Sequence, residues 1–455
     1  MPDIVLVIFA VVFVLGIAIN IHEFGHFLVA KFFGMRVEAY SFFGLGPRIW
    51  GFKIGHTDYR ISAIPLGAYV KLYGDEATAP LEGGDSNDEK VPESELYELR
   101  PRWQKFLVML GGPFMNIVLA LAIPFTIGLA YGVPSMPAPI VGMVRPNGAA
   151  DIAGVKVGDR IVAVDGTENP TWENVRDSAL ISPERDLTLT VERAGQRMPI
   201  TVRPTKITMS GNSAGDLELA PDAGVEPVDV GTVSPGSAAE EAGLKSGDRL
   251  IAYNKTAVRN AQEMTLLIRE NKDAPATFSV ERNGQRLEIP ITARAGDDGI
   301  YRVGVGFAQG AIDTLVPVGV GGAAAFAFEA NMRVLRLTGK VLGQMFSGER
   351  SVKDAGLSGP VGIVRTIAGA VSGDHVFLNL MSLLMGISLS LGIFNLLPIP
   401  LLDGGQIMVL GIEKVLSWFG RTLSMAWKER IQLTGLAFIL LLIVFVTFLD
   451  ISKFF

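Results

Sequence analysis

Four long apolar stretches constrain the fold of this chain more than any other feature. They run from Ile4 to Phe33, from Phe106 to Val133, from Val376 to Leu402 and from Ile431 to Leu449. Each is long enough to cross a bilayer, which takes roughly 20 apolar residues. Only 19% of the 455 residues are charged, whereas a soluble domain is about a quarter charged. The sequence therefore predicts a polytopic α-helical membrane protein with four transmembrane helices.

The distribution of Lys and Arg predicts the orientation of these helices. Nine lie between Gly34 and Lys105, and four lie between Gly411 and Arg430. Because positive loops stay in the cytoplasm, both connections are expected inside and both termini outside. The long region between the second and third stretches is then extracytoplasmic. The first three residues carry no basic group before the apolar run, so we do not expect a signal peptide.

Charge and cysteine content exclude several function classes. The net charge is −6, whereas nucleic-acid binding requires a basic surface, so no nucleic-acid partner is expected. The chain has no cysteine, which excludes disulfide frameworks, cysteine zinc modules and thiol catalysis. It has only four histidines, so a histidine metal site can be sought residue by residue.

The region between the second and third apolar stretches contains a duplication. Residues 144–163 and 233–252 are identical at eleven of twenty positions, and residues 191–197 match 280–286 at the same offset of 89. In each copy a short Ala-rich helix ends at a glycine, and Gly-Asp-Arg then leads into a strand. The pattern resembles PDZ domains of bacterial envelope proteases. PDZ domains bind extended peptides at a sheet edge; a duplicated spacer with closed grooves is the alternative.

An amphipathic helix is expected after the duplication. Phe328, Leu335 and Phe346 share one helical face, with Arg333 and Lys340 roughly opposite. A basic, amphipathic helix of this kind suits the membrane interface. Packing against the PDZ modules or against a neighbouring helix is the alternative. The preceding apolar run is short and rich in glycine, so it is not expected to be a fifth span.

The chemistry of the chain begins with His22-Glu-Phe-Gly-His26 in the first apolar stretch. Residues four apart share a helical face, so both imidazoles can bind one metal ion. Glu23 can then act as a general base toward water. Buried polar residues that only satisfy one another are the alternative, but ionisable groups inside a span are costly and mark function. His56 and His375 have no such neighbours and are expected at the surface.

A catalytic zinc usually has three protein ligands, and Asp403 is the candidate third ligand. It follows Pro398 and Pro400, which cannot continue a helix, and precedes Gly404 and Gly405. Irregular backbone within the membrane is tolerated where it is buried in protein or lines a wet cavity. With the predicted orientation, His22 and Asp403 both reach the cytoplasmic part of the bilayer. An aspartate in the headgroup region is the alternative.

Together these features resemble the site-2 protease family. The resemblance rests on the His-Glu-x-x-His motif at His22, the run Pro65-Leu-Gly-Ala-Tyr-Val70, the paired PDZ copies, and the motif Asn-x-x-Pro-x-Pro-x-Leu-Asp-Gly from Asn395 to Gly404. It implies zinc-dependent peptide-bond hydrolysis inside the bilayer. His22, His26 and Asp403 would bind Zn²⁺, Glu23 would be the general base, and Asn395 would hold substrate or polarise its carbonyl. For Asn116 a helix-packing role is expected.

The segment Tyr59–Leu72 has a strand-forming pattern, with a turn or kink at Pro65 and Gly67. In the family this region forms a membrane-dipping β element. An edge strand containing Gly67 and Tyr69 would hold substrate backbone extended; a plain cytoplasmic hairpin is the alternative.

The resemblance also implies the substrates and the location. The enzyme would lie in the bacterial inner membrane, with periplasmic PDZ domains, an active site near the cytoplasmic side and the lipid bilayer around it. Substrates would be single-span membrane proteins, such as an anti-sigma factor already trimmed on its outer side, and remnant signal peptides. The PDZ pair would act as a size filter or as a peptide groove. We favour the filter, because neither copy shows a plainly readable Gly-Leu-Gly-Phe loop. A metal or proton transporter would not require tandem PDZ copies, and a PDZ scaffold would not require the His-Glu-x-x-His motif.

The domain organisation follows from these assignments. We expect the first transmembrane helix at 1–33, a cytoplasmic or membrane-dipping β region at 34–105, the second helix at 106–133, PDZ domains at 140–226 and 227–306, amphipathic helices at 310–375, the third helix at 376–405, a cytoplasmic loop at 406–430, and the fourth helix with the tail at 431–455.

Overall fold

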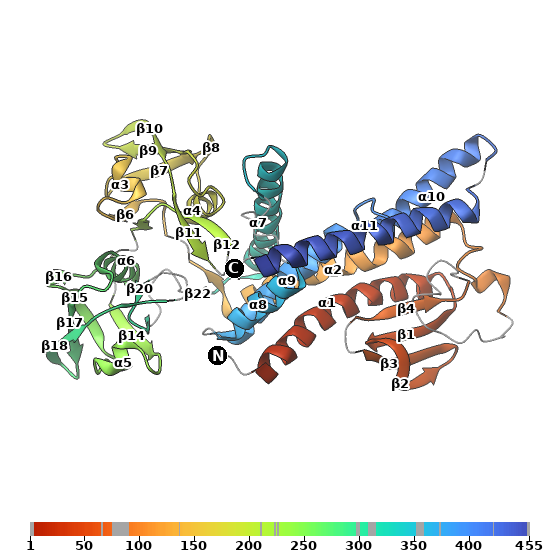
Figure 1. Cartoon of the computed structure of the whole chain (residues 1–455), viewed down its shortest axis with the longest axis horizontal. Helices are drawn as coiled ribbons and strands as arrows, with labels where there is room; N and C mark the ends of the chain where they lie inside the picture. The colour runs from red at the N-terminus through yellow and green to blue at the C-terminus, as the bar shows by residue number, and fades with distance from the viewer. Residues whose placement is uncertain are drawn as a thin grey trace. The chain divides into compact units, whose positions relative to one another are not determined.

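The chain forms two compact units, each described here separately (Figure 1). The membrane unit comprises Met1–Leu129, Val320–Val334 and Ser358–Phe455, and the β-rich unit comprises Ala130–Gly319 and Leu335–Leu357. The computed structural model describes residues 4–64, 67–74, 91–135, 137–209, 212–222, 224, 227–296, 301–307, 315–351, 359–372, 375–421 and 423–452.

Four helices of the membrane unit are long and apolar enough to cross a bilayer, counted over the described residues. They are α1 (Ile4–Phe32), α2 (Arg102–Tyr131), α9 (Val376–Asn395) and α11 (Met425–Ser452). This confirms the four predicted spans. The third span is shorter than the apolar stretch that predicted it, because α9 ends at Asn395, before Pro398 and Pro400.

A shared apolar core holds α1, α2 and α9 together with α8 (Pro360–Ser372). Ala10, Val14 and Ala18 of α1 are fully buried in this core, and they pack with Ile123 of α2 and Leu384 of α9. Small residues on α1 let the neighbouring helices approach closely. α11 is less enclosed, since only 6% of its most apolar 18-residue stretch is buried inside the protein.

A four-stranded sheet lies beside the C-terminal half of α1 (Figure 1). Its strands are β1 (Val37–Phe43), β2 (Leu45–Ile54), β3 (Thr57–Ile64) and β4 (Tyr69–Leu72), in the order β2-β3-β1-β4. β1 pairs in parallel with β3 and antiparallel with β4. The strand-forming segment Tyr59–Leu72 therefore does not form a hairpin, because β1 separates its two strands and β4 is an edge strand. Pro65 lies outside the described residues.

A further apolar helix, α10 (Asp403–Trp418), begins at Asp403, the candidate metal ligand. Most of the region expected to be a cytoplasmic loop at 406–430 is therefore helical, since α11 already begins at Met425.

The short 3₁₀ helix η1 (Glu93–Glu95) precedes α2, and the backbone N–H of Arg36 donates to the carbonyl of Glu95.

The β-rich unit contains two modules of the same construction, as the duplication predicts. The elements of the first are β6 (Val141–Val144), α3 (Ala149–Ile152), β7 (Arg160–Val164), β8 (Thr167–Glu168), α4 (Trp172–Leu180), β9 (Leu187–Arg193), β10 (Gln196–Val202), β11 (Thr205–Met209), β12 (Asn212–Asp216) and β13 (Leu219–Pro221). Those of the second are β14 (Val228–Val233), α5 (Ala238–Glu241), β15 (Arg249–Tyr253), β16 (Thr256–Ala257), α6 (Ala261–Asn271), β17 (Ala276–Arg282), β18 (Gln285–Ile291), β19 (Arg294–Ala295), β20 (Tyr301–Arg302) and β21 (Val305–Phe307). Outside the two modules, β5 (Val133–Pro134) and β22 (Leu315–Val316) form an antiparallel two-stranded sheet.

The Gly-Asp-Arg motif has the same structural role in both modules. Asp159 is buried and accepts two hydrogen bonds from Arg193, at 2.6 Å each. Asp248 is buried in the same way and accepts from Arg282 at 2.6 and 2.7 Å. Each pair joins a strand start to a strand end, so these aspartates stabilise the modules rather than carry chemistry.

The expected amphipathic helix is α7 (Val320–Phe346), and Asn331 on it packs against the neighbouring helix α2. In the membrane unit, Asn331 is buried and donates to the carbonyl of Ala120 at 2.9 Å. That carbonyl lacks its normal helical partner, because residue 124 of α2 is a proline without an N–H. In the β-rich unit, Arg350 follows α7 and donates to the carbonyls of Ile181 and Ser213.

Candidate metal centre

Helix α1 positions two imidazole rings inside the membrane unit. His22 and His26 are one helical turn apart and only 6% and 8% exposed. Their Nε2 atoms lie 3.2 Å from each other. The ring of His26 is fixed from behind, since its Nδ1 lies 2.7 Å from the backbone carbonyl of Val108. A proton on Nδ1 satisfies that carbonyl and leaves the Nε2 lone pair available for a metal.

Two glycines of α2 make room for these rings. An added Cβ at Gly112 would lie 2.4 Å from Nε2 of His26 and 2.8 Å from Nε2 of His22. At Gly111 it would lie 2.6 Å from the carbonyl oxygen of Gly25 in α1. The two helices therefore cross in backbone contact at the point where α1 carries its histidines, and only residues without a side chain fit there.

The third group arrives from a broken segment between α9 and α10. Leu401, just before Asp403, has a positive φ of 83°, a strained conformation for a side-chain-bearing residue. Gly404 and Gly405 allow the first turn of α10 to fold back on the preceding loop, because Cβ atoms there would lie 2.3 and 2.2 Å from the carbonyl oxygens of Leu396 and Ile399. The chain thus directs Asp403, the first residue of α10, toward α1.

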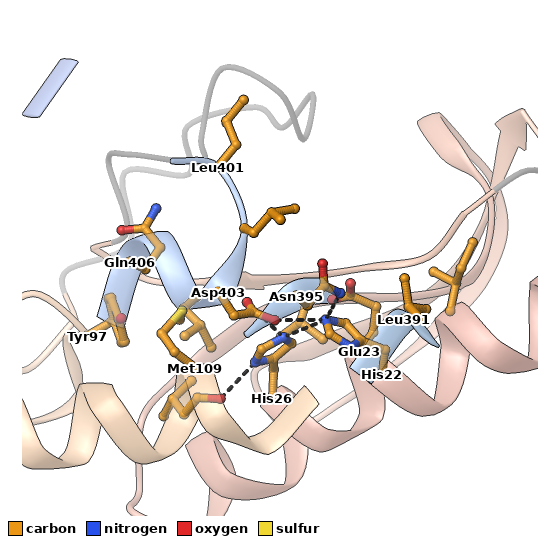
Figure 2. A pocket seen from close by; sticks show the side chains of 15 residues that line it. His22, Glu23, His26, Tyr97, Met109, Leu391, Asn395, Leu401, Asp403 and Gln406 are labelled. Atoms are coloured by element: carbon orange, nitrogen blue, oxygen red, sulfur yellow. Dashed lines mark hydrogen bonds and ion pairs between the residues drawn. The ribbon is translucent and has the colours of Figure 1, made fainter. Parts of the chain in front are cut away.

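The carboxylate of Asp403 completes a compact triangle with the two imidazoles (Figure 2). Its oxygens lie 3.1 Å from Nε2 of His22 and 3.4 Å from Nε2 of His26. Ligand atoms about 2.0–2.1 Å from a tetrahedral zinc are about 3.3 Å apart, so the observed separations fit this ion. Among the described residues, the buried Oδ2 of Asp403 makes no well-aligned hydrogen bond, although Nε2 of His22 lies 3.1 Å from it. Within the part of the chain that the structure describes, these three side chains form the group that could hold a metal ion.

A cavity of about 330 Å³ opens beside this triangle. Glu23, Asn395 and Gln406 line it with apolar side chains such as Leu391 and Met109 (Figure 2). Nδ2 of Asn395 lies 3.3 Å from Nε2 of His22. The site thus combines three metal-ligating groups, a carboxylate outside the ligand set and an amide, all next to a space that can hold a substrate.

Strand β4 forms part of the same cavity. Val70 and Leu72 line it together with Glu23. Gly67 and Tyr69, the residues predicted for substrate binding, do not line it. Gly67 has a positive φ of 97°, and Tyr69 is 4% exposed.

The structure separates the remaining polar candidates. His56 and His375 are exposed, as expected. Asn116, for which helix packing was expected, is fully buried, and its side-chain amide lies 3.2 Å from Nδ1 of His22. Sequence reasoning missed this contact; the available signal was a lone amide four residues after Gly112 in an otherwise apolar span.

Comparison with known proteins assigns the family. The sequence model of peptidase family M50 matches residues 10–442. This chain belongs to peptidase family M50. Its members are metalloproteases, in agreement with the geometry of His22, His26 and Asp403.

Similar proteins extend over nearly the whole chain. A putative zinc metalloprotease of Vibrio cholerae is 31% identical, with 91% of this chain and 92% of that protein covered. Protease RseP of Yersinia pestis is 32% identical, with 89% and 90% covered. The regulator of sigma-E protease RseP of Escherichia coli K12 is 30% identical, with 88% and 89% covered. The chain is thus an intramembrane metalloprotease of the RseP type, with zinc as its cofactor.

Solved PDZ domains resemble a small part of the chain. A PDZ domain of an SdrC-like protein from Listeria monocytogenes is 18% identical, with a TM-score of 0.17, and covers 18% of this chain and 85% of that domain. Its counterpart from Listeria innocua is 19% identical, with a TM-score of 0.18, and covers 18% and 96%. The four spans and the duplicated modules agree with the predicted class, a multi-pass helical membrane protein with PDZ domains.

Proposed function

We propose that this chain hydrolyses peptide bonds within the transmembrane segments of single-span membrane proteins, with His22, His26 and Asp403 as zinc ligands and Glu23 as general base. The observation that carries the proposal is the convergence of these ligands at one cavity. His26 and Asp403 are 377 positions apart in the sequence. The ligands nevertheless meet, and they do so among helices that are long enough to span a bilayer.

Each side chain at the cavity has a role in the proposed reaction. Zinc, when bound, polarises the scissile carbonyl and makes water acidic enough to lose a proton near neutral pH. Glu23 accepts a proton from water as the water oxygen bonds to the scissile carbonyl carbon, and it delivers that proton to the leaving amine as the C–N bond breaks. Asn395 donates its amide N–H to the oxygen of the scissile carbonyl, where negative charge develops.

Strand β4 presents the substrate to this site. A helical substrate hides its peptide bonds in its own hydrogen bonds, so it must become extended before it can be cut. We propose that the free edge of β4 pairs with the extended segment. Gly67 supplies the left-handed backbone conformation just before the strand. Tyr69 is buried and pairs with Ser41 of β1, so it holds β4 in the sheet. Val70 and Leu72 then face the substrate at the cavity.

The substrates and the orientation follow from the family resemblance and from the charge distribution. We place the protein in a bacterial inner membrane, with the PDZ modules in the periplasm and the metal centre near the cytoplasmic side. An anti-sigma factor, trimmed beforehand on its periplasmic side, would be the signalling substrate, and remnant signal peptides would be a second class. In this orientation the PDZ pair would lie on the side opposite the chemistry, and we propose that it excludes substrates with bulky outer domains.

The proposed reaction is tested with purified protein and a single-span reporter in detergent or bicelles. We expect cleavage within the apolar segment of the reporter. A zinc chelator should stop it, readdition of Zn²⁺ should restore it, and Glu23→Gln should abolish it. Cleavage that continues undiminished in Glu23→Gln would contradict the role of Glu23, and cleavage that resists chelation would contradict the metal mechanism.

A further inference from the structure

We propose that Asn116 is a positioning residue that holds His22 in the form that can bind zinc. This rests on the proposed function, because it concerns one of the proposed ligands. His22 directs Nε2 toward Asp403 and His26, at 3.1 and 3.2 Å. Its other nitrogen, Nδ1, lies 3.2 Å from Nδ2 of Asn116 in the amide orientation that the structure shows.

The chemistry of imidazole decides what Asn116 must offer. A neutral imidazole carries one proton, and ligation through Nε2 requires that this proton sits on Nδ1. Nδ1 is then a donor and needs an acceptor. A half-turn of a carboxamide about its last bond exchanges its oxygen and nitrogen. With its oxygen toward His22, Asn116 accepts the Nδ1 proton, and its NH₂ group faces the opposite way.

Helix α9 supplies the partner that this orientation requires. Oγ of Ser388 lies 3.0 Å from the backbone carbonyl oxygen of Asn116 and 3.4 Å from its side-chain Oδ1. The serine O–H donates to the backbone carbonyl. After the half-turn, the NH₂ group of Asn116 takes the place of Oδ1 and donates to a lone pair of Oγ. Ser388 and Asn116 are both fully buried, so water does not compete for these contacts. Nδ1 of His22 and the NH₂ group of Asn116 then each face one acceptor.

The two histidines are therefore supported differently. Nδ1 of His26 meets a backbone carbonyl, that of Val108, at 2.7 Å, which no substitution removes. Nδ1 of His22 meets a side chain, so its support can be changed. Loss of such an outer hydrogen bond typically lowers metal affinity about 10–100-fold.

The test measures zinc affinity of the full-length protein by competition with a chromophoric chelator. Asn116→Leu keeps the size of the side chain but removes the acceptor, and we expect affinity to fall about 10–100-fold. Asn116→Asp keeps an acceptor toward Nδ1, and we expect affinity equal to or higher than that of the wild type. A packing role predicts the reverse order, because leucine packs well whereas a buried carboxylate is costly.

Asn331→Leu is the matched control. Asn331 is also buried, at 3% exposed, and it also hydrogen-bonds to α2, through the carbonyl of Ala120, but it does not contact a histidine. Its loss should leave zinc affinity unchanged. If Asn116→Leu fails to fold, Asn116→Asp decides alone, since weaker zinc binding in it overturns the proposal. Zinc binding that is equal in wild type and His22→Ala would instead contradict the proposed function.

Discussion

Replacing Gly112 with alanine should destroy the metal centre while leaving helix α2 intact. Alanine is a better helix former than glycine by about 1 kcal/mol, so the substitution gives α2 itself no reason to unfold. The new methyl carbon would lie 2.4 Å from Nε2 of His26 and 2.8 Å from Nε2 of His22, whereas ordinary contact begins at 3.4 Å. The rings must therefore move by as much as about 1 Å.

The rings cannot make this movement without losing their partners. His26 is held by the carbonyl of Val108, and His22 lies against Asn116. Metal–ligand distances tolerate deviations of about 0.2 Å, and a misplacement of 1 Å at a catalytic group can cost about 10²-fold in rate. We therefore expect zinc affinity and reporter cleavage each to fall at least about 100-fold in Gly112→Ala.

Gly128→Ala is the control within the same helix. Its new Cβ would lie 3.4 Å from Ala323 and Phe326, which is ordinary contact. Zinc affinity by chelator competition, reporter cleavage and melting temperature should be measured for both variants. The reasoning is refuted if Gly112→Ala binds zinc as tightly as Gly128→Ala does.

Three further predictions concern other parts of the molecule. Gly67→Pro or Tyr69→Pro should slow reporter cleavage without removing zinc, because proline disrupts pairing of β4; unchanged turnover would count against strand addition. Burial raises the pKa of Asp159 and Asp248, but the arginine hydrogen bonds outweigh it and hold each pKa below its usual range. Their stabilisation is present above about pH 4 and lost as pH falls through the folded-state pKa, so Asn variants should increase protease sensitivity of the modules at pH 7 but progressively less toward pH 3. Deletion of Ile140–Arg294 should allow cleavage of untrimmed substrates; loss of trimmed-substrate cleavage without that gain would contradict the size filter.

The metal triad could be predicted from the sequence because each of its members carries a local signal. His22 and His26 share a helical face by spacing alone, and Asp403 lies where two prolines interrupt an apolar run. The four spans could be predicted because length and hydropathy determine them. The duplication was evident because both copies retain the buried Asp–Arg pair and its glycines.

Features that depend on helix packing could not be predicted. Asn116 and His22 are 94 residues apart, and only the crossing of α1 and α2 brings them together. The strand order β2-β3-β1-β4 includes a parallel pairing of β1 with β3, whereas the sequence pattern favours local hairpins. The region 406–430 was expected to be a cytoplasmic loop, whereas most of it belongs to α10 and the start of α11.

One motif in the second module was overlooked because of its position. Gly304-Val-Gly-Phe307 differs by one residue from the Gly-Leu-Gly-Phe loop that was sought. It lies at the C-terminal end of the module, where Val305–Phe307 forms β21 beside β14. A strand edge of this kind can receive an extended peptide. The deletion experiment therefore distinguishes the two proposed roles, filter and groove, and the edge strand β21 supports the groove.

Zinc content per chain in purified variants tests the central claim most directly. The claim is that His22, His26 and Asp403 bind one zinc while Glu23 is a base and no ligand. It predicts about one zinc per chain in the wild type and in Glu23→Gln, and a strong loss in His22→Ala, His26→Ala and Asp403→Ala. Full zinc content in Asp403→Ala, or loss of zinc in Glu23→Gln, would contradict it.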